Sequence, residues 1–206
     1  MRKNLSNLLL CMLLLSACST PPPEPQEALS STPENGEAMC ATMLEDEARP
    51  LSEEEILTAY HRAVEIYSWF ERSPLPSSGE SLRADGFRYH RVDADGLENL
   101  EDLRTYLRSV FSSELTERLL EGSGIRVRYR DIDGQLYVTG TGRNRKPGKG
   151  QAHIELDQLD SGVYSVNVLV NLLDSGGETV IGLESWSFPY VFVEDRWVFT
   201  DFQLID

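Results

Sequence analysis

The hydrophobic pattern of the chain changes its period near Gly124, and this change limits the folds that the chain can form. Before Gly124, apolar residues recur at steps of three and four, which is the spacing of one helix face. After it, apolar and polar residues alternate, most strictly over residues 164–172, as in a strand with one buried face. Helices followed by strands predict an α+β domain, with its N-terminal helices packed on a curved antiparallel sheet.

Three helices are expected in the first part of this domain. Ser52-Glu53-Glu54-Glu55 has the form of a capping box, so the first helix begins there. Its apolar stripe consists of Ile56, Tyr60, Ala63, Tyr67 and Phe70. The prolines of Ser73-Pro74-Leu75-Pro76 end this helix. A second helix is predicted from about Asn99, and a short third helix at residues 112–120.

One strand, residues 86–92, is expected between the first two helices. The remaining strands are predicted at residues 125–130, 135–139, 153–159, 164–172, 179–188 and 197–204. Asp133-Gly134 predicts a tight hairpin turn between the first two of these, and Pro189 indicates a break in the strand pairing, a bulge or an edge. This order of elements resembles the cystatin-like, or nuclear transport factor two-like, cone, which is an analogy of fold and not of function.

The start of the chain has the form of a bacterial lipoprotein signal. Two basic residues precede an apolar run from Leu8 to Leu15, which is shorter than the roughly 20 residues that a spanning helix needs. Leu15-Ser16-Ala17-Cys18 then resembles the cleavage motif of such a signal, which implies that residues 1–17 are removed and Cys18 is lipidated. A plain secretory signal is the alternative. We expect a lipid-anchored protein on the extracytoplasmic face of the cell membrane.

Residues 18–50 are expected to be a disordered tether, and residues 51–206 to form a single domain. The tether is rich in Pro, Ser and Glu, and it has few side chains that could bury apolar surface. The chain has three cysteines. Cys11 is removed with the signal and Cys18 carries the lipid, so Cys40 alone remains and has no intrachain partner for a disulfide. Cys40 is either a reactive thiol or a solvated side chain without a role.

The chain is strongly acidic, which excludes one class of partner. Its formal net charge is −15, and removal of residues 1–17 takes away two cations and no acids, which leaves −17. A surface of this sign repels nucleic acid. Contact with the membrane therefore depends on acyl chains at Cys18, each buried methylene of which adds about 0.8 kcal/mol.

No catalytic or metal-binding motif is present in the sequence. Phosphate-binding loops, paired cysteines, zinc-protease motifs and nucleophile elbows are all missing. The three histidines, His61, His90 and His153, fall on different predicted elements. We therefore expect a protein that is not an enzyme and needs no cofactor or metal. A small cone-fold enzyme, with Asp201 or Glu184 as a pocket acid, is kept as an alternative.

One basic loop departs from the acidic composition. Residues 141–150 contain Arg143, Arg145, Lys146 and Lys149, together with Gly and Pro residues that favour an exposed loop. These four cations are the predicted binding residues for an anionic partner, such as wall polymer, lipid headgroups or an acidic protein. The alternative is a solvated hairpin loop whose charges balance nearby acids.

A family resemblance covers residues 52 to about 140 and continues more loosely to the end. It is carried by Ala59-Tyr60-His61-Arg62-Ala63, Trp69-Phe70, Pro74-Leu75-Pro76, Tyr89-His90-Arg91-Val92 and Asp133-Gly134-Gln135-Leu136-Tyr137. In these segments the chain resembles the IseA-type inhibitors of cell-wall D,L-endopeptidases of Gram-positive bacteria. The resemblance implies an extracytoplasmic protein that binds NlpC-type peptidoglycan hydrolases and blocks their Cys-His active sites. The alternative is a non-catalytic binding or accessory lipoprotein of the envelope, whose cone pocket holds a small ligand or whose sheet docks on an envelope complex.

Overall fold

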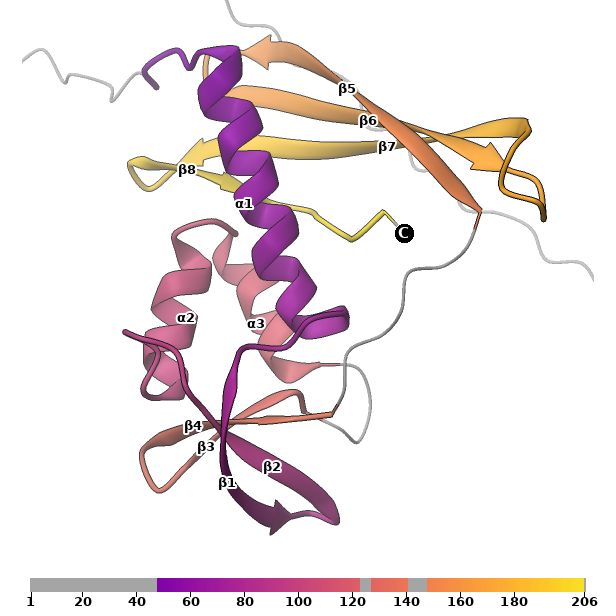
Figure 1. Ribbon diagram of the computed structural model, residues 1–206. Coiled ribbons are helices and arrows are strands. Elements are labelled where there is room, and N and C mark those ends of the chain that lie inside the picture. Colours follow the sequence, from indigo (N-terminus) through magenta and orange to yellow (C-terminus); the bar gives the residue numbers. More distant parts are fainter. Residues whose placement is uncertain (1–47, 123–126, 141–147, 206) are drawn as a thin grey trace, which may run out of the picture. The chain divides into compact units, whose positions relative to one another are not determined.

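The computed structural model describes residues 48–122, 127–140 and 148–205, which form three helices and two antiparallel sheets (Figure 1). The elements are α1 (Glu53–Glu71), β1 (Ser77–Ala84), β2 (Phe87–Val92), α2 (Leu100–Arg108), α3 (Ser113–Glu121), β3 (Tyr129–Ile132), β4 (Gln135–Thr139), β5 (Lys149–Asp160), β6 (Val163–Leu173), β7 (Val180–Val193) and β8 (Arg196–Phe199). Sheet A has the strand order β1-β2-β4-β3, and sheet B has the order β5-β6-β7-β8. The α+β class is confirmed, although one sheet was expected and the described strands form two.

Helix α1 begins at the predicted capping box. The side chain of Ser52 accepts a hydrogen bond from the Glu55 amide at 3.3 Å, and the Glu55 carboxylate accepts one from the Ser52 amide at 2.8 Å. The buried positions of the helix are Ile56, Tyr60, Ala63 and Ile66. The predicted stripe is therefore right for its first half, while Ile66 replaces its neighbour Tyr67 as the deepest residue of the second half.

Helix α1 connects the two sheets through hydrogen bonds at its ends. Just before the helix, the Leu51 amide donates to the hydroxyl of Tyr164 in sheet B at 3.1 Å. At the other end, the hydroxyl of Tyr129 in sheet A donates to the Trp69 carbonyl at 3.1 Å and accepts from the Leu75 amide at 2.9 Å. The tyrosines thereby fix where α1 starts and where the chain leaves it.

Strand β1 was not predicted, because its sequence is polar and shows no alternation. It forms by pairing with β2, so that Ala84 lies opposite Phe87 and Asp85-Gly86 is the two-residue turn. Both turn residues have positive φ, +48° and +82°, as the twist of a tight hairpin requires. Asp133-Gly134 makes the same kind of turn between β3 and β4, with φ of +55° and +77°, as predicted.

The alternating strand predicted at residues 164–172 is β6, and its inner face is buried. Tyr164, Val166, Val168 and Val170 are at most 5% exposed. Strand β7 runs past Pro189 without a break, because the Pro189 carbonyl points toward Thr200, whose amide donates to it at 3.1 Å. The missing N–H of Pro189 therefore faces the side where β8 has ended, and no hydrogen bond to β6 is lost.

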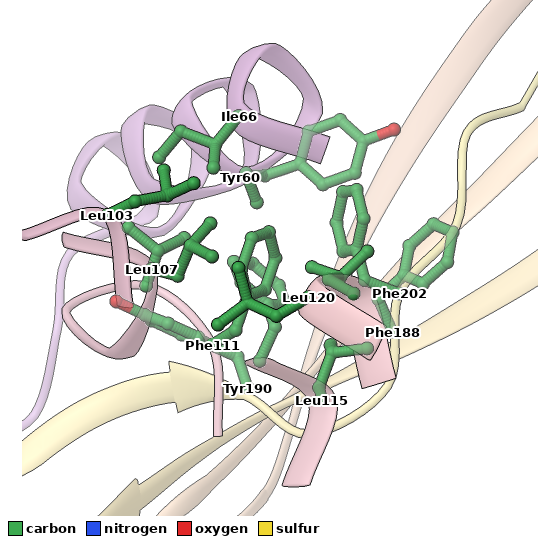
Figure 2. Packing of buried hydrophobic residues seen from close by; sticks show 14 of the residues in the cluster. Tyr60, Ile66, Leu103, Leu107, Phe111, Leu115, Leu120, Phe188, Tyr190 and Phe202 are labelled. Carbon is green, nitrogen blue, oxygen red and sulfur yellow. The ribbon is translucent and has the colours of Figure 1, made fainter. Parts of the chain in front are cut away.

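The core is a cluster of buried side chains, and Phe202 is one of its members (Figure 2). Its ring lies 4.6–5.8 Å, centroid to centroid, from five other rings, namely those of Tyr60, Tyr67, Phe111, Phe188 and Phe199. The strand predicted at 197–204 ends at Phe199, because the chain must leave the sheet for Phe202 to reach these rings. Backbone hydrogen bonds of 2.9 Å from Ser112 to Phe199 and from Phe199 to Val110 tie the α2–α3 connection to β8.

The predicted signal and all but the last residues of the predicted tether, with Cys18 and Cys40, lie outside the described residues. Within the described ranges, no helix is both long and apolar enough to span a bilayer. Among the described residues, the first element is α1.

Candidate functional site

A groove of about 390 Å³ lies between α1 and the inner face of sheet B. Its floor consists of Ala152 and Ile154 on β5 and of Val168 and Val170 on β6. Val64 on α1, with Leu204 and Ile205 of the C-terminal segment, completes the apolar lining. The groove exists because the alternation of β5 and β6 directs their small apolar side chains toward α1.

The polar groups of this groove are His61, Arg72 and Lys149. Lys149 forms an ion pair with Glu184, which lies on β7, across the intervening strand β6. Both side chains are partly buried, at 21% and 35% exposure. The groove therefore combines apolar walls with a cation, Lys149, whose charge is balanced by Glu184.

The two acids considered for catalysis, Glu184 and Asp201, lie apart: Glu184 is paired with Lys149 of the groove, whereas Asp201 lines another cavity. Asp201 borders a second cavity of about 330 Å³ together with Tyr67 and Arg118. Its carboxylate is 73% exposed and lies 3.6 Å from the Arg118 guanidinium. Burial raises the pKa of Tyr67, so its hydroxyl stays protonated at neutral pH. The structure therefore does not bring the two acids together in one site.

The three histidines lie on α1, β2 and β5, as expected from the sequence. His61 packs edge-on against Tyr60 with ring centroids 5.5 Å apart. His153 is exposed and lies 3.6 Å from the Glu155 carboxylate. In the part of the chain that the structure describes, no three side chains of the metal-binding types come together.

The four predicted binding cations are only partly within the described structure. Lys149 is the first residue of β5, which begins four residues earlier than the predicted strand, and it forms the ion pair with Glu184. Arg143, Arg145 and Lys146 lie outside the described residues, as does the predicted lipidation site Cys18. An anion-binding role for this segment stays a prediction.

Sequence reasoning missed a cluster of exposed apolar side chains on β7, which we call the β7 patch. It consists of Val180, Ile181 and Leu183, which are 52%, 67% and 66% exposed. The signal was present in the sequence: Val180-Ile181-Gly182-Leu183 breaks the alternation that would bury every second side chain. A bulge at this point places two residues of β7 opposite Leu173 of β6.

Comparison with known proteins does not identify a function for these sites. The chain matches no protein-family model, and a search of the curated proteins finds no match either. What the chain does is therefore inferred from its own residues.

Proposed function

We propose that the chain is a membrane-anchored, extracytoplasmic lipoprotein that binds and inhibits cell-wall peptidoglycan D,L-endopeptidases. The β7 patch is the observation that carries the binding part of this proposal, because three large apolar side chains are exposed within four residues. Contiguous exposed apolar surface marks sites of interaction. The class of the target rests on the resemblance to the IseA-type inhibitors, and the anchor rests on the motif at Cys18.

Inhibition by binding requires no catalytic group of the chain's own. Glu184 and Asp201, the two acids considered for catalysis, each lie beside a cation. An inhibitor of this kind acts by covering the active site of its target, so its working part is a surface and not a pocket. The lipid on Cys18 would restrict inhibition to hydrolases that act close to the membrane.

We also propose the cone as the architecture of the part built on sheet B. The packing of α1 on the inner face of a four-stranded antiparallel sheet supports a cystatin-like, or nuclear transport factor two-like, arrangement. Sheet A, with β1 to β4, is then an addition to this arrangement.

Direct binding tests the proposed function. The mature chain, residues 18–206 with Cys18→Ser to keep it free of lipid, is titrated with a purified NlpC-type D,L-endopeptidase in a calorimeter. We expect a saturable complex of equal numbers of the two proteins. An endopeptidase of another fold, with no Cys-His site, is the control and should give no heat of binding. No binding to the NlpC-type enzyme would contradict the proposal.

The groove favours a second candidate function, the binding of a small apolar ligand. Its volume of about 390 Å³ falls within the usual range for ligand sites, about 300–1,000 Å³. Decanoate, as a probe, should raise the melting temperature of the mature chain, because a ligand of the native state stabilises it. Ala152→Trp, which fills the groove from an exposed position on its floor, should abolish this rise. An unchanged melting temperature in the wild type would exclude this probe class.

A further inference from the structure

We propose that the outer face of β6 and β7, around the β7 patch, is the surface that docks on the target hydrolase, and that the target offers an apolar patch with a basic rim. This inference rests on the proposed function. The surface, which we call the docking face, has an apolar part, formed by Leu169 and Leu173 on β6 with the β7 patch. Its polar part is formed by Asn167 on β6 with Ser185 and Ser187 on β7. The register places the paired residues of this surface opposite the inner face, on the side turned away from α1: Leu173 pairs with Val180, Asn171 with Leu183 and Leu169 with Ser185. Ile181 is the extra residue of the bulge and is exposed.

The docking face carries no charge, although 26% of the chain's residues are charged. The outward positions of β6 are Val163, Ser165, Asn167, Leu169, Asn171 and Leu173, and those of β7 are Val180, Leu183, Ser185, Ser187, Pro189 and Val191. Depletion of charged side chains distinguishes the centre of an interface from the remaining surface of a protein. In such an acidic domain, two neighbouring strands without an outward charge therefore indicate a contact surface.

The polar part of this face is held in place by hydrogen bonds across three strands. Ser165 is only 5% exposed and supports this part from below: its hydroxyl lies 2.7 Å from that of Ser187 and donates to the Asn167 side chain at 2.9 Å. Asn167 in turn donates to the Asp157 carboxylate at 2.7 Å. Side chains that are already ordered lose little conformational entropy on binding, so this network favours association with a partner.

The turn before the β7 patch is ordered in the same way. The Asp174 carboxylate accepts hydrogen bonds from the amides of Glu178 and Thr179 at 3.2 and 3.3 Å. These bonds lower the pKa of Asp174, with the Thr179 amide the largest cause. Asp174 is therefore ionised at neutral pH, and it places a carboxylate at the end of the docking face.

Acids border the polar part of the docking face as well, whereas His153 of β5 pairs with Leu169 of the apolar part. On β5, Glu155 pairs with Asn167 and Asp157 pairs with Ser165, so both carboxylates stand beside the outward side chains of β6. Both residues are exposed. An uncharged centre with an acidic border fits a partner that presents apolar side chains flanked by lysine or arginine, because complementary charge speeds encounter and fixes orientation.

The same border argues against two other occupants. A second copy of the chain would bring its own acidic border against Glu155 and Asp157, and like charges in contact are unfavourable. A bilayer with anionic headgroups would repel these carboxylates in the same way. A protein of opposite local charge is therefore the occupant that the side chains favour.

The test compares two patch variants with a matched control. Ile181→Glu and Leu183→Glu place a charge in the docking face, and Leu159→Glu does so on β5, outside it. The wild-type side chains are equally exposed, at 67%, 66% and 67%, so similar effects on folding are expected. Binding of each mature chain to the purified NlpC-type endopeptidase is measured by calorimetry, and circular dichroism confirms the fold. Each patch variant should bind at least about tenfold more weakly, while Leu159→Glu should bind like the wild type.

The charge border has its own test. Glu155→Lys combined with Asp157→Lys should slow association and reduce its dependence on salt, because rim charges act mainly on the association rate. Leu183→Ser is a milder patch variant, and it should weaken binding in the same direction as Leu183→Glu.

The outcomes separate the two proposals. If the wild type binds and the patch variants bind equally well, the docking face is not the contact surface and the proposed function stands. If the wild type does not bind, the proposed function is wrong, and the docking face assigned for this target falls with it.

Discussion

Replacement of Phe202 should destabilise the domain more than its position after the last strand suggests. The side chain is 3% exposed, and its ring contacts five other rings that come from α1, the α2–α3 connection, β7 and β8. Truncation of a buried phenylalanine to alanine costs about 3–5 kcal/mol, since it removes apolar contacts and leaves a cavity. The free energy of unfolding of natural domains is about 5–15 kcal/mol, so Phe202→Ala should remove a large fraction of the free energy of unfolding of this domain.

The assay is urea unfolding of the mature chain, followed by tryptophan fluorescence. For a domain of this size, a loss of about 4 kcal/mol corresponds to a fall in melting temperature of roughly 10 °C. Leu204→Ala is the control, because Leu204 lies two residues further along the same segment and is only partly buried; it should cost about 1 kcal/mol. A loss below about 1 kcal/mol for Phe202→Ala would refute the view that this segment completes the core.

Three further predictions concern the start of α1 and the anchor. Ser52→Ala should lower the free energy of unfolding by about 1 kcal/mol, because the amide of Glu55 loses its cap; urea titration measures this. The hydrogen bond from Arg49, with those from Ser52, lowers the pKa of Glu55 from 4.5 to about 2. A carboxyl whose pKa is lowered by folding contributes stability that is complete above its ordinary pKa and is lost as the pH falls through the folded value. Between pH 4.5 and about 2, unfolding of Glu55→Gln should therefore depend less on pH than that of the wild type; equal slopes would contradict this. Finally, Cys18→Ala should abolish labelling of the chain by radioactive palmitate in a bacterial host, whereas Cys40→Ala should retain it.

The parts of the fold that follow from local chemistry could be predicted from the sequence. The capping box fixed the start of α1, the Asp133-Gly134 pair fixed a hairpin turn, and the alternation around Val168 identified a strand with one buried face. Each of these depends on neighbouring residues alone. Strand β1 lacks such a pattern, because it lies at the edge of sheet A and is largely exposed.

The division into two sheets and the site itself could not be predicted in this way. Alternation tells which face of a strand is buried, and it does not tell which strand lies beside it. Lys149 and Glu184 are 35 positions apart in the sequence. They meet only because β5 and β7 lie on either side of the same strand, β6. Likewise, the run Val180-Ile181-Gly182-Leu183 was visible in the sequence, but only the register shows that Val180 and Leu183 face away from α1.

The most direct test of the proposed function is the digestion of purified peptidoglycan by an NlpC-type D,L-endopeptidase in the presence of increasing amounts of the mature chain. Release of soluble peptide fragments is measured, with Leu159→Glu and Leu183→Glu as parallel samples. We predict that digestion falls with added wild type and with Leu159→Glu until the two proteins are equimolar, and that Leu183→Glu protects the wall poorly. Complete digestion at a stoichiometric excess of the wild-type chain would contradict the account.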